Sequence, residues 1–300
     1  MAHATYRFID PRTLAALRDL ELVARTVVDG FMYGIHPSRI PGAGIEFSQY
    51  RSYQPGDDLR RIDWKLLGRS DRYFVREADT DTSLTLRLVL DASASMGAED
   101  DGLTSFDYAR FAAAALAVLA HRQGDAVGLY AVGEGVARVV PPDRRHQQVH
   151  RLLHELEQVA PGGVWPSWPV LEGALLGGGG RGLVVFLTDL HERVDEIRQA
   201  ARTFAALRHE TLVLHLIGRR EMTLDYPGVV TFEELETGRR LDVDTGAERE
   251  SYRTSLNRHL DEIRRGFEER GIGYTRLALD QPLDFALRAW LKARGRAGVH

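Results

Sequence analysis

The chain has 300 residues, of which 44% are hydrophobic and 27% charged, a composition typical of a folded globular protein. Its 39 basic and 43 acidic residues give a net charge of −4, so no global field attracts nucleic acid or an anionic membrane. Because it has no cysteine, disulfides, iron–sulfur clusters, thiolate zinc sites and a cysteine nucleophile are excluded.

The hydropathy of the chain predicts no membrane span. Its longest apolar run, residues 111–120, has half the length of a membrane-spanning helix and is closed by Arg110 and His121. The N-terminal sequence MAHATYRFIDPR lacks the apolar centre of a signal peptide. We therefore expect a cytoplasmic location.

The N-terminal part, residues 1–83, combines one predicted helix with an irregular polar segment. Asp10 and Pro11 are typical of a helix start, apolar residues then recur at helical spacing, and Gly30 is expected to end the helix. From residue 34 to 81 the sequence is polar and rich in turn signals, and we expect short strands there, such as one around residues 73–76. We predict that this β-rich part packs on the domain that follows.

Residues 84–300 alternate apolar strands with helices. Strands are predicted at 84–91, 126–132, 136–140, 182–189, 211–218 and 274–279, a hairpin at 229–243, and helices near 106–123, 144–159, 194–208, 252–270 and 283–293. Strands that are apolar on both faces and alternate with helices indicate an α/β fold with a mostly parallel sheet covered on both sides.

A carboxylate and two hydroxyls follow the first apolar strand. Asp91 ends this strand, and Ser93 and Ser95 come next in the string LVLDASASMG. These oxygen ligands suit a hard cation such as Mg²⁺, and open α/β sheets bind ligands beyond the strand ends. Asp189 ends another buried strand and is expected in the same crevice, where two carboxylates repel each other unless a cation or proton lies between them. The alternative, that these side chains only cap the following helices, stays open.

The D-x-S-x-S string resembles the metal-ion-dependent adhesion site (MIDAS) of von Willebrand factor type A domains. The segment GIEFSQYRSYQPGDDLRRIDWKLLGRSDRYFVRE, residues 44–77, resembles the signature of a bacterial family, domain of unknown function 58 (DUF58). This resemblance extends from about residue 20 to the C-terminus. It implies a doubly wound type A domain over residues 84–300, with a metal held by Asp91, Ser93 and Ser95 at the end of the first strand.

The later positions of the type A motif match only in part. Asp189, in the string FLTDL, matches the later acidic position. The resemblance implies a threonine after a glycine pair, but the pair at 162–163 is followed by Val164, and Ser167 is a speculative substitute. The implied cation is Mg²⁺, with Mn²⁺ or Ca²⁺ as alternatives, at a site that lacks one expected hydroxyl.

Residues 50–77 interleave basic and aromatic side chains, a pattern that also occurs in proteins that bind single-stranded nucleic acid. Because acidic residues lie among them and little net charge remains, we expect no nucleic-acid partner. Two interpretations stay open: a turn-rich structural platform, or a docking surface in which Trp and Arg anchor a partner protein. The candidate partner-binding residues are Arg51, Tyr53, Asp57, Asp58, Arg61 and Trp64.

Three histidines recur at helical spacing but do not indicate a metal site. His146, His150 and His154 lie beside Arg145 and Arg151, which repel a cation, so we expect a solvent-exposed flank.

The expected function is a protein–protein interaction module and not an enzyme. The resemblance implies an adaptor or chaperone-like partner of a MoxR-type AAA+ ATPase, with a carboxylate of the partner completing the coordination of the cation. Two alternatives stay open. One is a metal-free scaffold that has lost its cation site, which Val164 favours. The other is a Mg²⁺- or Mn²⁺-dependent hydrolase that uses Asp91 and Asp189, with His191 as the candidate base.

Overall fold

The structure, a computed structural model, describes residues 11–15, 19–35, 50–52, 74–76, 84–133, 138–166, 182–191, 194–233 and 238–297. The chain divides into two compact units, residues 1–35 with 84–300, and residues 36–83. The described part of the smaller unit is an antiparallel pair of strands, β1 (Tyr50–Ser52) and β2 (Phe74–Arg76). Of these, β2 lies where a strand was expected. The N-terminal helices belong to the larger unit, whereas the sequence analysis grouped them with the segment up to residue 83.

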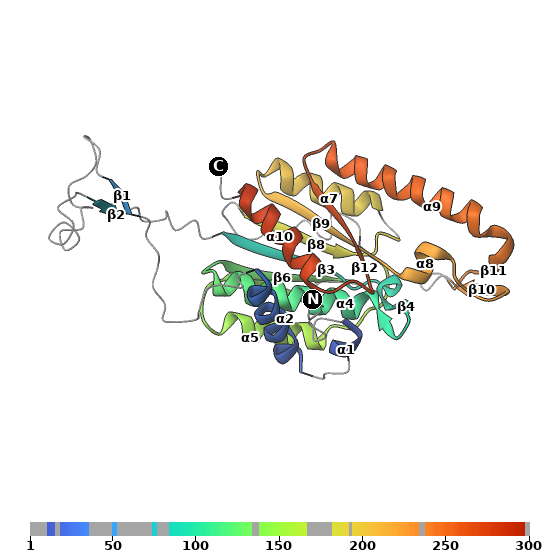
Figure 1. Ribbon diagram of the computed structural model, residues 1–300, viewed down its shortest axis with the longest axis horizontal. Coiled ribbons are helices and arrows are strands. Elements are labelled where there is room, and N and C mark those ends of the chain that lie inside the picture. Colours follow the sequence, from blue (N-terminus) through green and yellow to red (C-terminus); the bar gives the residue numbers. More distant parts are fainter. Residues whose placement is uncertain are drawn as a thin grey trace, which may run out of the picture. The chain divides into compact units, whose positions relative to one another are not determined.

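A six-stranded sheet forms the centre of the larger unit (Figure 1), in the order β12–β9–β8–β3–β6–β7. All neighbouring strands are parallel except β7, which runs antiparallel to β6. The strands are β3 (Thr85–Asp91), β6 (Ala126–Val132), β7 (Arg138–Asp143), β8 (Leu183–Thr188), β9 (Glu210–Ile217) and β12 (Gly273–Ala278). This order confirms the prediction of a doubly wound, mostly parallel sheet.

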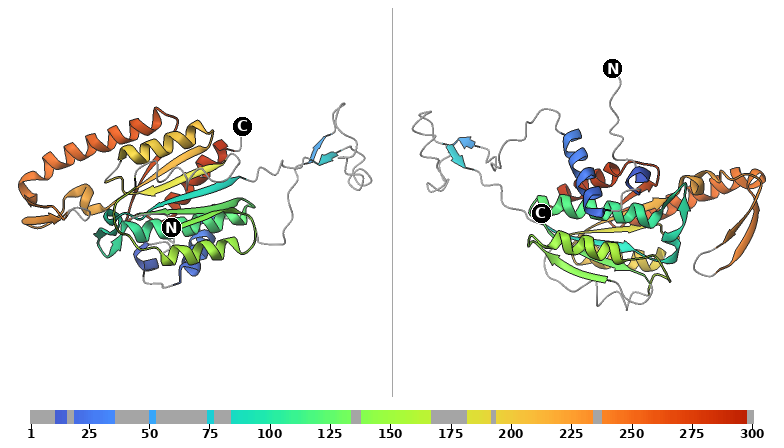
Figure 2. Two further views of the ribbon diagram at one scale, coloured as in Figure 1. Left: turned by 180° about the vertical axis from the view of Figure 1, so that it is seen from behind. Right: turned by 90° about the horizontal axis from the view of Figure 1, so that it is seen from below.

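Helices cover both faces of the sheet (Figures 1 and 2). On one face pack α2 (Leu20–Ile35), α4 (Ser105–Arg122), α5 (Gln148–Gln158) and α10 (Asp284–Ala297), and on the other α7 (Val194–Ala206) and α9 (Thr245–Glu268). Neighbouring strand residues point to opposite faces, so Leu88 enters the first core and Val89 the second. Burial on both faces explains why these strands read as continuous apolar runs.

The N-terminal helical segment differs from the prediction. It contains two helices, α1 (Pro11–Ala15) and α2, and not one. The backbone N–H of Leu22 donates to the side chain of Asp19 at 2.9 Å, which provides a new helix start. Gly30 does not end α2, because the helix packs on α4 through residues such as the buried Phe31 and this packing outweighs the cost of about 1 kcal/mol for a helical glycine.

Short elements were missed because they span too few residues for a hydrophobic period. They are the 3-10 turn η3 (Ala94–Gly97), the strands β4 (Glu99–Asp100) and β5 (Leu103–Thr104), and α8 (Arg219–Thr223). The predicted hairpin is confirmed as β10 (Val229–Glu233) paired with β11 (Arg240–Asp244).

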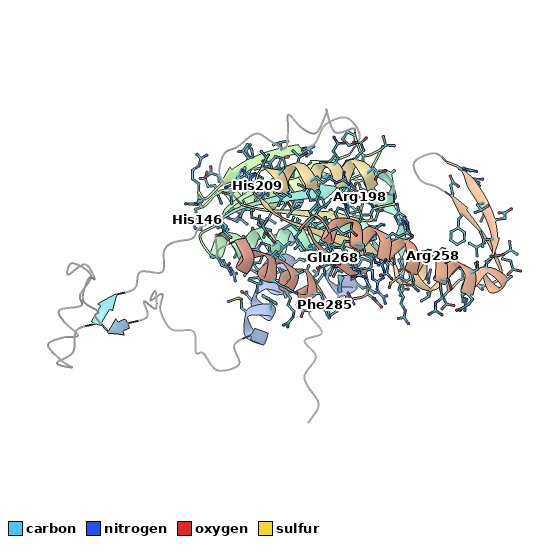
Figure 3. The ribbon with its side chains drawn as sticks, turned by 90° about the horizontal axis from the view of Figure 1, so that it is seen from above. His146, Arg198, His209, Arg258, Glu268 and Phe285 are labelled. Carbon is cyan, nitrogen blue, oxygen red and sulfur yellow. The ribbon has the colours of Figure 1, made fainter. Side chains whose placement is uncertain are left out.

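The helix α9 begins at residue 245, earlier than the expected 252, because the side chain of Asp244 accepts hydrogen bonds from two backbone N–H groups of its first turn. Figure 3 shows charged residues of this helix, among them Arg258 and Glu268, which are exposed. Ile263 and Phe267 pack into the second core.

Candidate functional site

The carboxyl ends of β3 and β8 meet at the topological switch point of the sheet. These strands are neighbours, and they are the first and fourth strands of the sheet along the chain. The helix that follows β3 covers one face of the sheet and the helix that follows β8 covers the other. An open α/β sheet binds ligands in the crevice that this divergence creates. Asp91 is the last residue of β3, and Asp189 directly follows β8, so both predicted carboxylates lie at this crevice.

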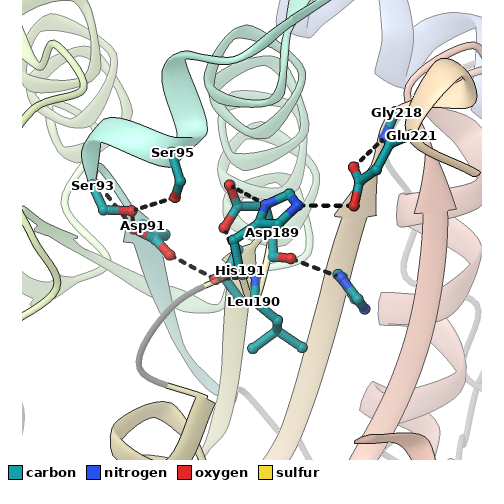
Figure 4. Close-up of polar contacts among 10 residues, drawn as sticks. Asp91, Ser93, Ser95, Asp189, Leu190, His191, Gly218 and Glu221 are labelled. Carbon is teal, nitrogen blue, oxygen red and sulfur yellow. Dashed lines mark hydrogen bonds and ion pairs between the residues drawn. The ribbon is translucent and has the colours of Figure 1, made fainter. Parts of the chain in front are cut away.

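Hydroxyl groups surround the carboxylate of Asp91 (Figure 4), which is 3% exposed. Asp91 Oδ1 accepts hydrogen bonds from the backbone N–H of Ser93 at 2.9 Å and from Ser93 Oγ at 2.7 Å. Ser95 Oγ lies 3.1 Å from Ser93 Oγ. Thr188 Oγ1 donates to Asp91 Oδ2 at 2.6 Å and so links β3 with β8. The tight turn at η3 therefore brings the predicted carboxylate and both predicted serines together.

The segment with the glycine pair, residues 162–163, lies beside this turn. The backbone N–H of Gly162 donates to the carbonyl of Ala92 at 2.9 Å, and Ala94 N–H donates to the carbonyl of Gly163 at 2.9 Å. Val164 follows with 41% of its surface exposed, so this position supplies an apolar side chain and no hydroxyl. The speculative substitute, Ser167, lies outside the described residues.

Asp189 has a charged neighbour, His191, besides the hydroxyl of Ser95. Its carboxylate, also 3% exposed, accepts a hydrogen bond on Oδ1 from the backbone N–H of His191 at 3.2 Å. His191 Nδ1 lies 3.0 Å from Asp189 Oδ2, and His191 Nε2 lies 2.8 Å from Glu221 Oε1 (Figure 4). The imidazole therefore bridges two carboxylates, one at the end of β8 and one on α8.

The backbone of Asp189 is fixed by a second histidine. The buried His215, on β9, contacts the carbonyl oxygen of Asp189 through Nε2 at 2.8 Å and the hydroxyl of Tyr274 through Nδ1 at 2.6 Å. A neutral imidazole that donates from Nε2 and accepts at Nδ1 satisfies both contacts. Burial accounts for this state, because it lowers the pKa of His215 to about 4.

The two carboxyl groups have pKa values shifted in opposite directions. Burial raises the pKa of Asp91 to about 7, and repulsion by Asp189 adds to the shift. Burial acts on Asp189 as well, but hydrogen bonds and the charge of His191 outweigh it and hold the pKa of Asp189 below its usual value. Partial burial lowers the pKa of His191, whose side chain is 43% exposed, yet its contacts with Asp189 and Glu221 raise this pKa well above the usual value. At neutral pH Asp189 is thus ionised, while Asp91 is near its midpoint.

The donor set has the chemistry of a hard-cation site. Asp189 Oδ2 is buried and lies 3.0 Å from His191 Nδ1, and the hydroxyl of Ser95 also helps to lower the pKa of Asp189. Oxygen atoms of Asp91, Ser93 and Ser95 complete a set that suits Mg²⁺. Within the described ranges, no three His, Asp or Glu side chains form a group that could hold a metal, so a cation here depends on the serine hydroxyls.

Sequence reasoning missed four of the groups around this site, namely Thr188, His215, Glu221 and Tyr274. Thr188 had a signal, because it precedes Asp189 at a strand end. Glu221 and Tyr274 had none, since they lie 30 and 59 residues from the histidines that they contact. His191 was considered only as the base of a hydrolase, a role that requires a free ring nitrogen, whereas here both ring nitrogens face carboxylates.

The three histidines that the sequence analysis placed on a solvent-exposed flank, His146, His150 and His154, are exposed. His146 stacks on His121 with ring centroids 6.1 Å apart, and His150 lies 3.2 Å from Glu21. Arg51 lies on β1, where only the backbone is described. The remaining candidate partner-binding residues, Tyr53, Asp57, Asp58, Arg61 and Trp64, lie outside the described residues.

Comparison with known proteins gives a family match and close sequence relatives. Residues 49–262 match the family model described as "Protein of unknown function DUF58". Uncharacterized proteins of Mycobacterium bovis (Mb1516) and Mycobacterium tuberculosis (Rv1480) are each 34% identical over 282 residues, which cover 92% of this chain and 87% of the relative.

Solved structures show more distant similarity. BatB from Bacteroides thetaiotaomicron has 15% identity and a TM-score of 0.47, over 73% of this chain and all of that one. The SpRpn10 VWA domain has 10% identity and a TM-score of 0.38, over 69% of this chain and 94% of that one. With TM-scores below 0.5, neither similarity bears on function. In the described part of this chain, no helix is long and apolar enough to cross a membrane.

Proposed function

Because the chain belongs to the DUF58 family, whose description assigns no activity, we propose from its site that it is a protein–protein interaction module. The contact with the partner is centred on a divalent cation at the carboxyl ends of β3 and β8. Asp91, Ser93, Ser95 and Asp189 hold this cation, and a carboxylate of the partner completes its coordination. The observation that carries the proposal is the convergence of two buried carboxylates, Asp91 and Asp189, with the serine hydroxyls at one crevice.

The proposed cation neutralises charge that the fold concentrates. Two buried carboxylates at one crevice repel each other, and this repulsion adds to burial, the larger cause, in raising the pKa of Asp91. A divalent cation removes the repulsion. Two of the four protein ligands are neutral hydroxyls, so the ligand charge does not exceed that of the cation, and a coordination position remains for an acidic side chain of another protein. The chain's own residues supply position and charge balance, and the proposal includes no chemical conversion.

The proposed partner is a MoxR-type AAA+ ATPase, for which the chain acts as an adaptor or chaperone-like factor. This part rests on the resemblance stated for residues 44–77 and on membership of the family. The hydrolase alternative has less support, because His191 has no free ring nitrogen with which to accept a proton.

A metal-free scaffold is the second candidate. Two observations favour it: Val164 supplies no hydroxyl, and His191 already places an imidazole beside Asp189. In this alternative the same partner binds without a cation, so chelation separates the two candidates.

Affinity capture from a lysate of the source organism tests the proposal. The full-length chain is immobilised and offered lysate with Mg²⁺ or with EDTA, alongside Asp91→Ala and a control, Asp195→Ala, which removes an exposed carboxylate on α7. We expect the wild type and the control to retain an AAA+ ATPase with Mg²⁺ only, and Asp91→Ala to retain none. Retention of the ATPase in EDTA supports the metal-free scaffold. Failure to retain it in any sample contradicts both candidates.

A further inference from the structure

His191 connects the candidate cation site to α8, which no other described contact of the site does directly. Its Nδ1 lies 3.0 Å from Asp189 Oδ2, and its Nε2 lies 2.8 Å from Glu221 Oε1 (Figure 4). Since both ring nitrogens face carboxylate oxygens, the protonated imidazole, which donates from both nitrogens, satisfies this arrangement. His191 thus occupies the oxygen of Asp189 that a cation would also need.

Glu221 in turn holds the first turn of α8. Its second oxygen, Oε2, accepts a hydrogen bond from the backbone N–H of Gly218 at 3.3 Å, where β9 passes into α8. Arg220, the residue before Glu221, donates its backbone N–H to Asp100 Oδ2 on β4 at 3.1 Å. The two carboxylate oxygens of Glu221 therefore contact different groups, one the ring of His191 and the other the backbone at the start of α8.

The chain after α8 leads directly to the β10–β11 hairpin and α9. Tyr226 packs edge-on against Phe232 of β10, with ring centroids 5.4 Å apart. Thr245, the first residue of α9, donates through Oγ1 to the carbonyls of Tyr226 at 2.7 Å and of Gly228 at 2.8 Å. These contacts join α8, the hairpin and the start of α9, so a change at Glu221 can reach all three.

The loop that carries His191 is held in a costly backbone conformation. Leu190, between Asp189 and His191, has φ of 53°, a value that non-glycine residues rarely adopt. Burial of its side chain and the hydrogen bond from its backbone N–H to Thr188 Oγ1 at 3.1 Å maintain it. Such strain is typical of functional loops that have an alternative arrangement.

From these contacts we propose that His191 and a divalent cation exclude each other at Asp189, so that cation binding releases Glu221 and loosens α8 and the hairpin. The inference rests on the proposed cation site. A cation bound by Asp189 and the ring nitrogen Nδ1 of His191 compete for the same oxygen, Oδ2, which lies 3.0 Å from that nitrogen. In the state described here His191 contacts that oxygen, and the contact of His191 with Glu221 connects α8 to the site.

Linkage then requires the effect to be reciprocal. If the cation weakens the pair between His191 and Glu221, the pair weakens cation binding by the same factor. Removing His191 therefore tightens Mg²⁺ binding by about 5-fold or more, the lower range of typical coupling between sites. Glu221→Gln, which keeps the imidazole but removes its outer charge partner, tightens binding by a smaller factor.

Two measurements on the full-length chain test the proposal, namely Mg²⁺ titration by calorimetry and amide hydrogen exchange with and without Mg²⁺. The variants are His191→Ala, Glu221→Gln and, as a control, His150→Ala, which removes another histidine paired with a carboxylate but on α5. We expect Mg²⁺ to accelerate exchange at residues 218–224 and 229–233 of the wild type and of the control. In His191→Ala these amides exchange fast without Mg²⁺ and Mg²⁺ changes them little. Far-UV circular dichroism checks that each variant is folded.

The outcomes separate this proposal from the cation site on which it rests. Equal Mg²⁺ affinity of the wild type and His191→Ala, or exchange at α8 that does not respond to Mg²⁺, overturns the competition while the cation site stands. If His191→Ala binds Mg²⁺ and the wild type does not, His191 excludes the cation completely, and the competition is supported. If neither protein binds Mg²⁺, the cation site and the competition both fail.

Discussion

The loop after β3 and the loop after β8 each accommodate a buried carboxylate, but they do so with different neighbouring groups. Each carries a buried carboxylate at the same edge of the sheet, with the same 3% exposure. The β3 loop surrounds Asp91 with neutral hydroxyls, and its pKa is raised to about 7 by burial first and by Asp189 second. The β8 loop gives Asp189 a charged partner in His191, and the pKa of Asp189 is lowered. Burial alone therefore does not decide whether a carboxylate is ionised. The imidazole of His191, which lies beside Asp189 only, makes the difference between the two.

Replacing Asp91 by asparagine gives the largest change that this comparison predicts. In EDTA at pH 8, Asp91→Asn raises the free energy of unfolding by about 2 kcal/mol, because the wild type must keep a buried carboxylate ionised. Asparagine keeps an oxygen that can accept from Ser93. Urea denaturation measures the change. Lower stability of the variant at pH 8 would contradict the comparison.

The size of this stabilisation by Asp91→Asn depends on pH. The pKa of Asp91 is raised from 3.8 to about 7 in the folded state, so the folded state holds this proton more tightly than the unfolded chain. Its contribution to stability is full below pH 3.8 and is lost as the pH rises through about 7. The difference between wild type and Asp91→Asn therefore grows from pH 5 to pH 8 in EDTA. A difference that stays constant over this range would refute the role of Asp91 titration.

Asp189→Asn should change stability in the opposite direction. It removes the charge opposite His191 and leaves the imidazolium with Glu221 alone, so we expect a loss of about 1–2 kcal/mol at pH 7. Urea denaturation beside Asp195→Asn, an exposed carboxylate on α7, supplies the matched control. If Asp189→Asn stabilised the protein, the contact with His191 would not compensate the cost of burying the charge of Asp189.

Thr188→Val tests the hydroxyl that joins the two loops. The hydroxyl donates to Asp91 Oδ2 at 2.6 Å and accepts from the backbone N–H of Leu190 at 3.1 Å. Valine has nearly the same shape but leaves this N–H without its partner, so we expect a loss of about 1 kcal/mol. Thermal unfolding in EDTA measures the loss, and an unchanged midpoint would show that the hydroxyl does not stabilise the loops.

Val164→Thr has the smallest expected effect and makes the β3 side of the site more hydroxyl-rich. The residue follows a backbone segment that is hydrogen-bonded to the Asp91 turn, and it is exposed. A hydroxyl here strengthens Mg²⁺ binding by about 3-fold, since one more oxygen ligand or water partner becomes available. Calorimetric titration compares the variant with wild type, and an unchanged affinity would place residue 164 outside the influence of the site.

The sequence predicted the sheet and the first half of the site for physical reasons. Strands buried on both faces read as apolar runs, and the aspartates that end β3 and β8 interrupt those runs at recognisable places. The convergence of Asp91 with Ser93 and Ser95 follows from their spacing on one turn.

The second half of the site depends on contacts that no local pattern encodes. Glu221 reaches His191 only because α8 follows β9 beside β8, and α8 has five residues, too few for a hydrophobic period. In the same way, the helix break before α2 depends on one side chain, Asp19, within a sequence whose apolar spacing continues.

Calorimetric titration of the wild-type chain with Mg²⁺ at pH 8, beside Asp91→Asn, tests the central claim most directly. At this pH Asp91 is mostly ionised, so proton competition at the site is small. The account predicts saturable binding of Mg²⁺ by the wild type and a loss of about 100-fold or more in affinity for Asp91→Asn, which removes a charged ligand. Absence of Mg²⁺ binding by the wild type, or equal binding by the variant, would contradict a cation site at Asp91 and Asp189.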